Sequence, residues 1–209
     1  MTHGLVAHWP ADGDALDASG FGNHGKLSGS GVIQYAAGHS GDAFAFSGQG
    51  WVEVPDAPIL DPASALTLAA WVRPDTVTGA DIFGKDGECK NRQYVFSIGA
   101  SSLRLRGHVG TASGFHNTDG KSSLQAGVWT HFAMTYDSIT GELVLYVNGA
   151  VDGGLTVPAG SRCIISTPEP LRIGGGSTCG TPYPFPGRVD EARVYDRALS
   201  AAEIAALAK

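Results

Sequence analysis

Aromatic side chains occur in glycine-rich and polar segments that strand periodicity does not place in a core. Phe115, Tyr183 and Phe185 are the rings in question. A ring that faces solvent can stack on the apolar face of a sugar, while amide and charged neighbours bond the sugar hydroxyls. The polar residues expected to join Phe115 and Tyr183 in such a site are Lys85, Asp86, Asn91, Arg92, His116 and Asn117. The alternative is that these segments are polar only because they face water.

The acidic residues do not form the pattern expected of a glycan-cleaving site. A retaining glycosidase needs two carboxylates about 5 Å apart. On one strand this requires acids close together on the same face, as in E-x-D-x-E, and no such string is present. Asp190 and Asp196 share a face but are too far apart along the strand. The motifs G-x-S-x-G and H-E-x-x-H are also absent. We therefore predict no catalytic residues.

A calcium site is predicted from Asp17, Asn23 and Asp190. Calcium binds several carboxylate and carbonyl oxygens at once, and the glycine-rich residues 20–25 could add carbonyls to these side chains. The ion should stabilise the fold and take no part in chemistry. The alternative is that Asp17 and Asn23 form Asx turns or cap backbone N–H groups.

The elements that position these residues are predicted to be short β-strands. Apolar residues alternate with a period of two along most of the chain, and helical periodicity appears only at the end. The expected strands cover residues 5–10, 32–35, 43–47, 51–54, 66–73, 81–85, 94–98, 103–108, 130–136, 142–148, 155–157, 171–174 and 188–195. Asn148-Gly149 is a strong hairpin signal.

Strand direction predicts where the longer loops lie. If consecutive strands alternate in direction, the loops at 86–92, 111–127 and 176–187 share one rim of the molecule. If the first strand also pairs antiparallel with the last, residues 12–25 join the same rim. The candidate sugar-binding residues would then converge there.

The same argument assigns the three cysteines. Cys89 and Cys179 lie on the shared rim, and Cys163 lies at the other end of the strands. A strand of five or six residues spans about 17–20 Å, whereas a disulfide tolerates only about 6 Å between Cα atoms. We therefore predict a Cys89–Cys179 disulfide with Cys163 free, the alternative being three reduced thiols.

The C-terminal segment has a recognisable pattern. Residues 187–204 read G-R-V-D-E-A-R-V-Y-D-R-A-L-S-A-A-E-I, a strand followed by a short helix, with Ser200 and Glu203 as a capping box. This string resembles the C-terminal signature of the laminin-G-like, concanavalin A-like jelly-roll domains. Further segments resemble the same family in order along the chain: L-V-A-H-W-P at 5–10, D-A-S-G-F-G-N-H-G at 17–25, A-A-W-V-R-P at 69–74, W-T-H-F-A-M-T-Y-D at 129–137 and L-Y-V-N-G at 145–149.

The resemblance implies an all-β fold. We expect one domain over residues 1–209, a two-sheet antiparallel jelly-roll sandwich with a short C-terminal helix after Ser200. The family is mostly extracellular and often carries structural calcium near residues 17–25. Many relatives have an acidic pair where this chain has Gln49-Gly50, so a site that depends on that pair is absent.

Composition excludes several classes of partner. The chain of 209 residues has a formal net charge of −6 and only 16% charged residues. Nucleic acids and anionic membranes call for basic patches, and no apolar run approaches the roughly 20 residues of a membrane span. Residues 1–3 are polar and do not resemble a secretory signal. A cytoplasmic protein is one interpretation; we favour a domain of a longer secreted or cell-surface protein.

These observations lead to one functional prediction with two alternatives. We expect a non-catalytic, lectin-like module that binds a glycan, with other domains of a parent protein as possible neighbours. The first alternative is a structural or adhesion module that binds a protein partner. The second is a glycan-cleaving enzyme whose site the sequence does not reveal.

Overall fold

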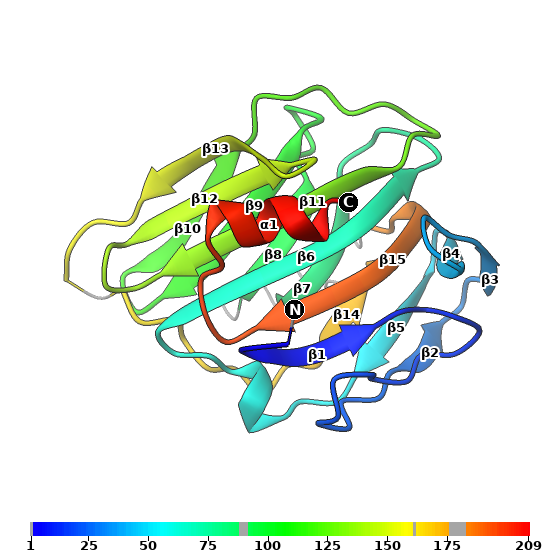
Figure 1. Cartoon of the computed structure of the whole chain (residues 1–209), viewed down its shortest axis with the longest axis horizontal. Helices are drawn as coiled ribbons and strands as arrows, with labels where there is room; N and C mark the ends of the chain where they lie inside the picture. Colours follow the sequence, from blue (N-terminus) through cyan, green and yellow to red (C-terminus); the bar gives the residue numbers. More distant parts are fainter. Residues whose placement is uncertain (1, 88–91, 161, 176–182) are drawn as a thin grey trace.

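Two antiparallel sheets packed face to face make up the protein (Figure 1). The computed structural model describes residues 2–87, 92–160, 162–175 and 183–209. The architecture confirms the expected sandwich with one short C-terminal helix in the described part of the chain. No helix among these residues is both long enough and apolar enough to cross a membrane.

Sheet A lies in front in Figure 1 and carries the helix on its outward face. Its spatial order is β13-β12-β11-β6-β15-β4-β3, and β1 pairs with β15. The bounds are β1 Leu5–Trp9, β3 Ile33–Ala37, β4 Asp42–Ser47, β6 Ala65–Pro74, β11 Thr130–Asp137, β12 Glu142–Val147, β13 Ala150–Thr156 and β15 Pro186–Tyr195. The antiparallel pairing of the first and last strands is as expected.

Sheet B lies behind sheet A, with the order β10-β9-β8-β7-β14-β5-β2. Its strands are β2 Lys26–Gly29, β5 Gly50–Val54, β7 Ala80–Asp86, β8 Arg92–Ile98, β9 Leu105–Thr111, β10 Gly114–Asp119 and β14 Leu171–Ile173. A short 3-10 helix, η1, covers Pro58–Leu60.

The core fills the space between the sheets because each strand sends alternate side chains inward. Phe96 of β8 meets Phe132 of β11 edge to face, with ring centroids 6.2 Å apart, and so joins the two sheets. Trp9 of β1 makes a similar contact with Phe83 of β7 at 6.0 Å. All four rings are fully buried. Burial of each such ring stabilises the fold by roughly 2–3 kcal/mol.

A second, smaller cluster lies between sheet A and helix α1, Ala201–Leu207. Ile204 packs there against Tyr195 and Leu199. The capping box is present as predicted, because the Ser200 hydroxyl accepts from the Glu203 N–H and the Glu203 carboxylate accepts from the Ser200 N–H. The predicted Asn148-Gly149 turn is also confirmed, with φ values of +49° and +79° between β12 and β13.

The expected strands missed β2 and β10, and the missing β10 made the predicted rim wrong. Residues 114–119 form β10, which pairs with β9 along its whole length, whereas the sequence suggested a loop over 111–127. One extra strand reverses the direction of every strand after it. Accordingly β14 runs antiparallel to β7, so the segments that follow these two strands leave in opposite directions. The end of β7 and the end of β14 therefore do not lie at one rim.

Candidate functional site

A pocket of about 410 Å³ opens on the outward face of sheet B. Its lining residues come from β7 to β10, from the turn after β8 and from the segment before β15. They are Ala80, Asp81, Arg92, Ser97, Ile98, Gly99, Ala100, Arg106, His108, Phe115, Asn117 and Tyr183. The volume falls within the usual range for small-molecule sites, about 300–1,000 Å³.

Strand register explains why these polar residues gather on one face. Asp81 pairs with Ser97, and Ser97 pairs in turn with Arg106. The adjacent row places His108 opposite Asn117. Cross-strand partners point to the same side of a sheet, so the two rows form a continuous polar floor. Their neighbours in the chain, Phe96 before Ser97 and Leu105 before Arg106, belong to the core.

The pocket unites four of the predicted ligand residues. Arg92 comes from β8, Phe115 and Asn117 from β10, and Tyr183 from the segment before β15. Phe115 is 41% exposed and Tyr183 is 38% exposed, so both rings can be reached from solvent. These residues meet on the face of the sheet and not at the predicted rim.

The two arginines of the pocket are each paired with a carboxylate. Arg106 donates from Nε and Nη2 to the two carboxylate oxygens of Asp119 at 2.6 and 2.8 Å. This bidentate bond holds the pKa of Asp119 below its usual value. Arg92 Nε lies 2.9 Å from Oδ1 of Asp86, another of the predicted ligand residues. The positive charges are thus compensated within the protein, and Asp81 adds a further carboxyl group to the lining.

His108 contributes a neutral ring to the floor. Burial, reinforced by the charges of Arg92 and Arg106, lowers its pKa to about 3. At neutral pH the imidazole therefore offers one N–H donor and one lone pair. Its Nε2 atom lies 3.4 Å from the Ser97 hydroxyl. Ring, hydroxyl and the nearby Asn117 amide form a set of uncharged groups suited to hydroxyl partners.

Sequence reasoning missed the floor itself, namely Asp81, Ser97, Arg106 and His108. All four occupy alternate positions in strands that were predicted correctly. The available signal was a polar residue at one or two alternate positions in each of three neighbouring strands. That signal could not be used without the order of the strands in the sheet.

Two predicted ligand residues face elsewhere. Lys85 is fully buried: its Nζ atom lies 2.5 Å from Asp56 Oδ1 and 3.1 Å from the Thr167 carbonyl, and it also bonds Asp61. The structure therefore corrects the prediction that Lys85 faces a ligand. His116 lies on the other side of β10 from Asn117, and its Nε2 contacts the hydroxyls of Thr111 and Ser113 at 3.1 and 3.2 Å.

The remaining predicted residues are Phe185, Asn91 and the cysteines. Phe185, expected in an exposed loop, is fully buried in the main core. Asn91 lies outside the described residues. Cys89 and Cys179 also lie outside them, whereas Cys163 is exposed and free. The Cys89–Cys179 disulfide stays a prediction, now without the rim argument that suggested it.

The Asp17 carboxylate is used to hold the loop that follows β1. Oδ1 accepts from the N–H groups of His8 and Ser19, and Oδ2 accepts from the Ser19 hydroxyl and the Asn23 N–H, all at 2.8–2.9 Å. Four donors saturate a carboxylate. Asn23 in turn donates from Nδ2 to the Val6 carbonyl at 2.9 Å. This arrangement is the Asx-type alternative and leaves Asp17 no lone pair for a cation.

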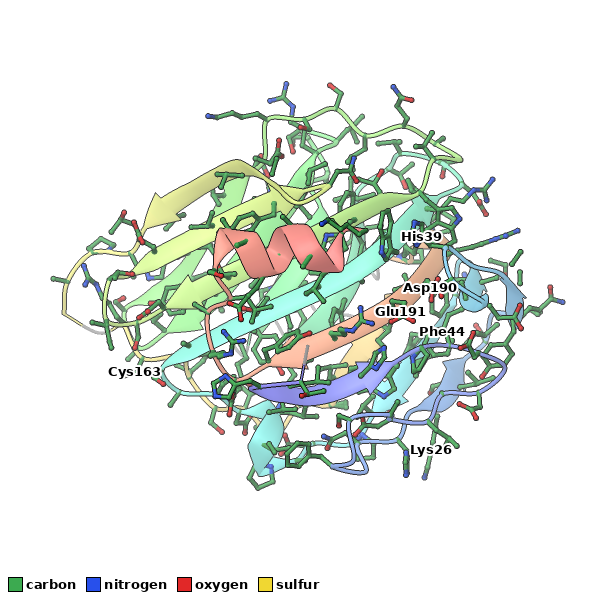
Figure 2. The ribbon with its side chains drawn as sticks, viewed as in Figure 1. Lys26, His39, Phe44, Cys163, Asp190 and Glu191 are labelled. Atoms are coloured by element: carbon green, nitrogen blue, oxygen red, sulfur yellow. The ribbon has the colours of Figure 1, made fainter. Side chains whose placement is uncertain are left out.

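Asp190 holds a different loop. Its Oδ2 accepts from the N–H groups of His39 and Ser40 at 2.8 and 2.9 Å; Figure 2 shows His39 beside Asp190. The His39 ring then stacks on Trp71 with centroids 3.5 Å apart. Burial, as the main cause, raises the pKa of Asp190 to about 6. Within the described ranges, no group of three or more His, Cys, Asp or Glu residues could hold a metal ion.

Comparison of the sequence with protein families gives one match. Residues 46–205 match the family described as the concanavalin A-like lectin/glucanases superfamily. A comparison with curated proteins finds no match.

Solved structures of similar fold include binding domains of larger proteins. Domain 4 of AbnA, a GH43 extracellular arabinanase from Geobacillus stearothermophilus, in complex with arabinotriose, is 24% identical with a TM-score of 0.78, and all of both chains is covered. The binding domain of Paraclostridial Mosquitocidal Protein 1 is 18% identical with a TM-score of 0.73; 98% of this chain and 52% of that chain are covered. A third structure is that of botulinum neurotoxin type C, a toxin whose cell entry depends on interaction with two ganglioside molecules. It is 14% identical with a TM-score of 0.72, and 98% of this chain and 50% of that chain are covered. The chain thus spans about half the length of these toxin chains.

Proposed function

Because the chain belongs to the concanavalin A-like lectin/glucanase superfamily, we propose that it is a non-catalytic module that binds an uncharged glycan in the pocket of sheet B. The observation that carries the proposal is the composition of the pocket. Its arginines are paired with carboxylates, its uncharged hydrogen-bonding groups are Ser97, His108 and Asn117, and two exposed rings line the same pocket. We further propose that it works as part of a secreted or cell-surface protein.

Charge compensation favours a neutral sugar over an acidic one. Arg106 already donates two hydrogen bonds to Asp119, and Arg92 is already paired with Asp86, so neither arginine is available to an incoming carboxylate or sulfate. Such a group would also meet the carboxylates of Asp119 and Asp86 beside these arginines. Like charges brought together cost about 2 kcal/mol or more. Neutral hydroxyls avoid this cost.

The rings supply the apolar contact. A sugar ring presents C–H groups on one face, and an exposed aromatic side chain can cover them. Phe115 stands two residues from Asn117 on the same face of β10, so one sugar residue can contact the ring and the amide together. Tyr183 approaches from the opposite wall. This division into apolar rings and a few polar groups is typical of ligand pockets.

The carboxyl groups of the pocket argue for binding without cleavage. Glycoside hydrolysis calls for one carboxylic acid and one free carboxylate on either side of the bond. Asp119 is committed to Arg106, which leaves Asp81 as the carboxylate in the lining of the described pocket. A binding role needs no second carboxylate.

Solved structures of the same fold suggest the first probe. The arabinanase domain was obtained with arabinotriose, an uncharged oligosaccharide. We therefore choose arabinotriose and a panel of neutral and acidic oligosaccharides for a glycan array followed by titration calorimetry. Neutral members should bind and their uronic acid or sulfated counterparts should not.

Paired variants make this experiment specific. Phe115→Ala should weaken binding by about 2 kcal/mol, roughly 30-fold, because a central ring in a pocket is an anchor. Phe21→Ala is the matched control: Phe21 is 57% exposed but lies outside this pocket. Equal loss in both variants, or binding confined to acidic glycans, would refute the proposal. Binding of a protein partner and of no glycan would favour an adhesion module.

A further inference from the structure

We propose that the pocket holds the end of a glycan chain and cannot accommodate the interior of one. This inference rests on the proposed function. It follows from how the outward face of sheet B is filled beside the pocket.

The face of sheet B is closed immediately beyond Asp81. Asp81 lines the large pocket and also a second void of only about 10 Å³. The other residues around this void are Phe83, Gly84, Asp86, Val95, Arg172 and Gly175. Such a volume accommodates about one water molecule. The space that a sugar could occupy therefore ends at Asp81.

Burial of an outward-facing residue also indicates that the sheet face is closed beside the pocket. Val95 lies between Tyr94 and Phe96, whose side chains belong to the main core, so Val95 faces outward. It is nevertheless only 1% exposed and belongs to neither core cluster. Val95 pairs with Gly84 of β7, so the sheet face at this pair is covered and offers no surface to a ligand.

Tyr183 and Gly174 are held to the edge of β7 by backbone hydrogen bonds. The N–H of Asp81 donates to the carbonyl of Tyr183 at 3.0 Å, and the N–H of Gly174 donates to the carbonyl of Ile82 at 2.8 Å. Phe185, two residues beyond Tyr183, is anchored in the core. The bond from Asp81 and the buried Phe185 therefore hold Tyr183 beside β7, where it lines the pocket.

A turn closes the pocket at the end of β8. The N–H of Gly99 donates to the carbonyl of Arg104, and the N–H of Leu103 donates to the carbonyl of Gly99, at 2.9 and 2.8 Å. A Cβ atom on Gly99 would come within 3.1 Å of both Arg106 Nε and Asp119 Oδ1, so the turn packs directly on this ion pair. A chain running parallel to the strands would meet the turn.

The open side lies over β10. Phe115 and Asn117 are exposed, and β10 has no further strand beyond it in the described sheet. A glycan can enter here but cannot leave on the far side. Were the sheet face open, a chain would continue along the row His108, Val95, Gly84, Arg172 and Glu53 toward Trp51. The closed middle separates Trp51 from the pocket.

The test counts binding sites on a polymer before and after its chains are shortened. The probe is linear arabinan, or, should arabinotriose not bind, the linear neutral polysaccharide that binds best in the panel. Partial endo-hydrolysis that shortens the chains about tenfold should raise the number of sites per gram about tenfold, because each cut creates new ends. Affinity should also stay within about twofold from trisaccharide to hexasaccharide.

Two variants separate end binding from a through-going groove. Trp51→Ala should leave affinity for every oligosaccharide within about twofold, whereas Phe115→Ala should reduce it by about tenfold or more. A site count that stays constant during hydrolysis, or a tenfold loss in Trp51→Ala, would overturn end recognition while leaving glycan binding intact. Absence of binding to every glycan in the panel would overturn the proposed function and this inference together.

Discussion

Replacement of Lys85 by methionine should reduce stability strongly and leave glycan binding unchanged. Lys85 is fully buried on the inward side of β7, and three oxygens surround its Nζ atom, from Asp56, Asp61 and the Thr167 carbonyl. Methionine has a similar length and no charge, so the substitution removes the cation with little change of volume. What it leaves behind is a pair of carboxylates without their counterion.

The expected loss follows from the exposure of those carboxylates. The side chain of Asp61 is only 13% exposed and also accepts from the Ser166 hydroxyl at 2.7 Å, whereas that of Asp56 is 36% exposed and can be hydrated. Loss of one partner of a buried ion pair costs about 3–5 kcal/mol. Because Asp56 reaches water, we expect the lower value, about 3 kcal/mol. For a chain of this size that corresponds to a fall in Tm of about 6–12 °C.

Chemical denaturation and calorimetry measure this loss, and titration with the oligosaccharide that binds most tightly in the panel measures affinity. The double variant Lys85→Met/Asp61→Asn should recover part of the stability, since it removes the less exposed of the two stranded charges. A loss below about 1 kcal/mol would refute the assignment of Lys85 to a buried ion pair. A loss of affinity in a variant that is still folded would show that Lys85 contacts the ligand.

Further predictions concern pH, calcium and the cysteines. The folded pKa of Asp190, about 6, lies above its ordinary value of 3.8, so the native state binds the extra proton and this group favours folding as pH falls from 7 toward 4; Asp190→Asn should remove that dependence in pH-resolved denaturation. Glycan affinity should be constant between pH 5 and 8 as far as His108 is concerned, because its pKa of about 3 keeps it neutral there. Calcium should bind only if Asp17 releases some of its four donors, so an EDTA-insensitive thermal transition would rule out the predicted site. Peptide mass spectrometry without reduction should find Cys89 linked to Cys179, and a Cys163 cross-link would contradict the assignment.

Much of the fold could be predicted because its determinants are local. Period-two alternation identified the strands whose inward residues form the core. The start of the helix could be predicted because Ser200 and Glu203, three residues apart, form its capping box. By contrast, β10 has the sequence G-F-H-N-T-D, which has no apolar alternation. It forms a hairpin with β9 across the two-residue turn at 112–113, and its polar residues gave no periodic signal from which that pairing could be predicted.

The site was only half predictable for the same reason. Phe115 and Tyr183 could be found because exposed rings in polar segments are unusual. Lys85 was misassigned because lysine is normally exposed, and the carboxylates that bury it lie in the segment around η1. Ser97 and His108 were missed because their proximity depends on strand register. The sequence shows which residue types are present, but which of them lie next to one another depends on how the strands pair in the sheet.

A crystal structure of the protein with its tightest neutral oligosaccharide tests the central claim most directly. The account predicts a terminal sugar residue on the floor formed by Ser97 and His108, with one face against Phe115 and hydroxyls bonded to Asn117. The rest of the oligosaccharide should extend over β10 into solvent. A sugar bound on sheet A, at Trp51, or across the middle of sheet B with the pocket empty would contradict it.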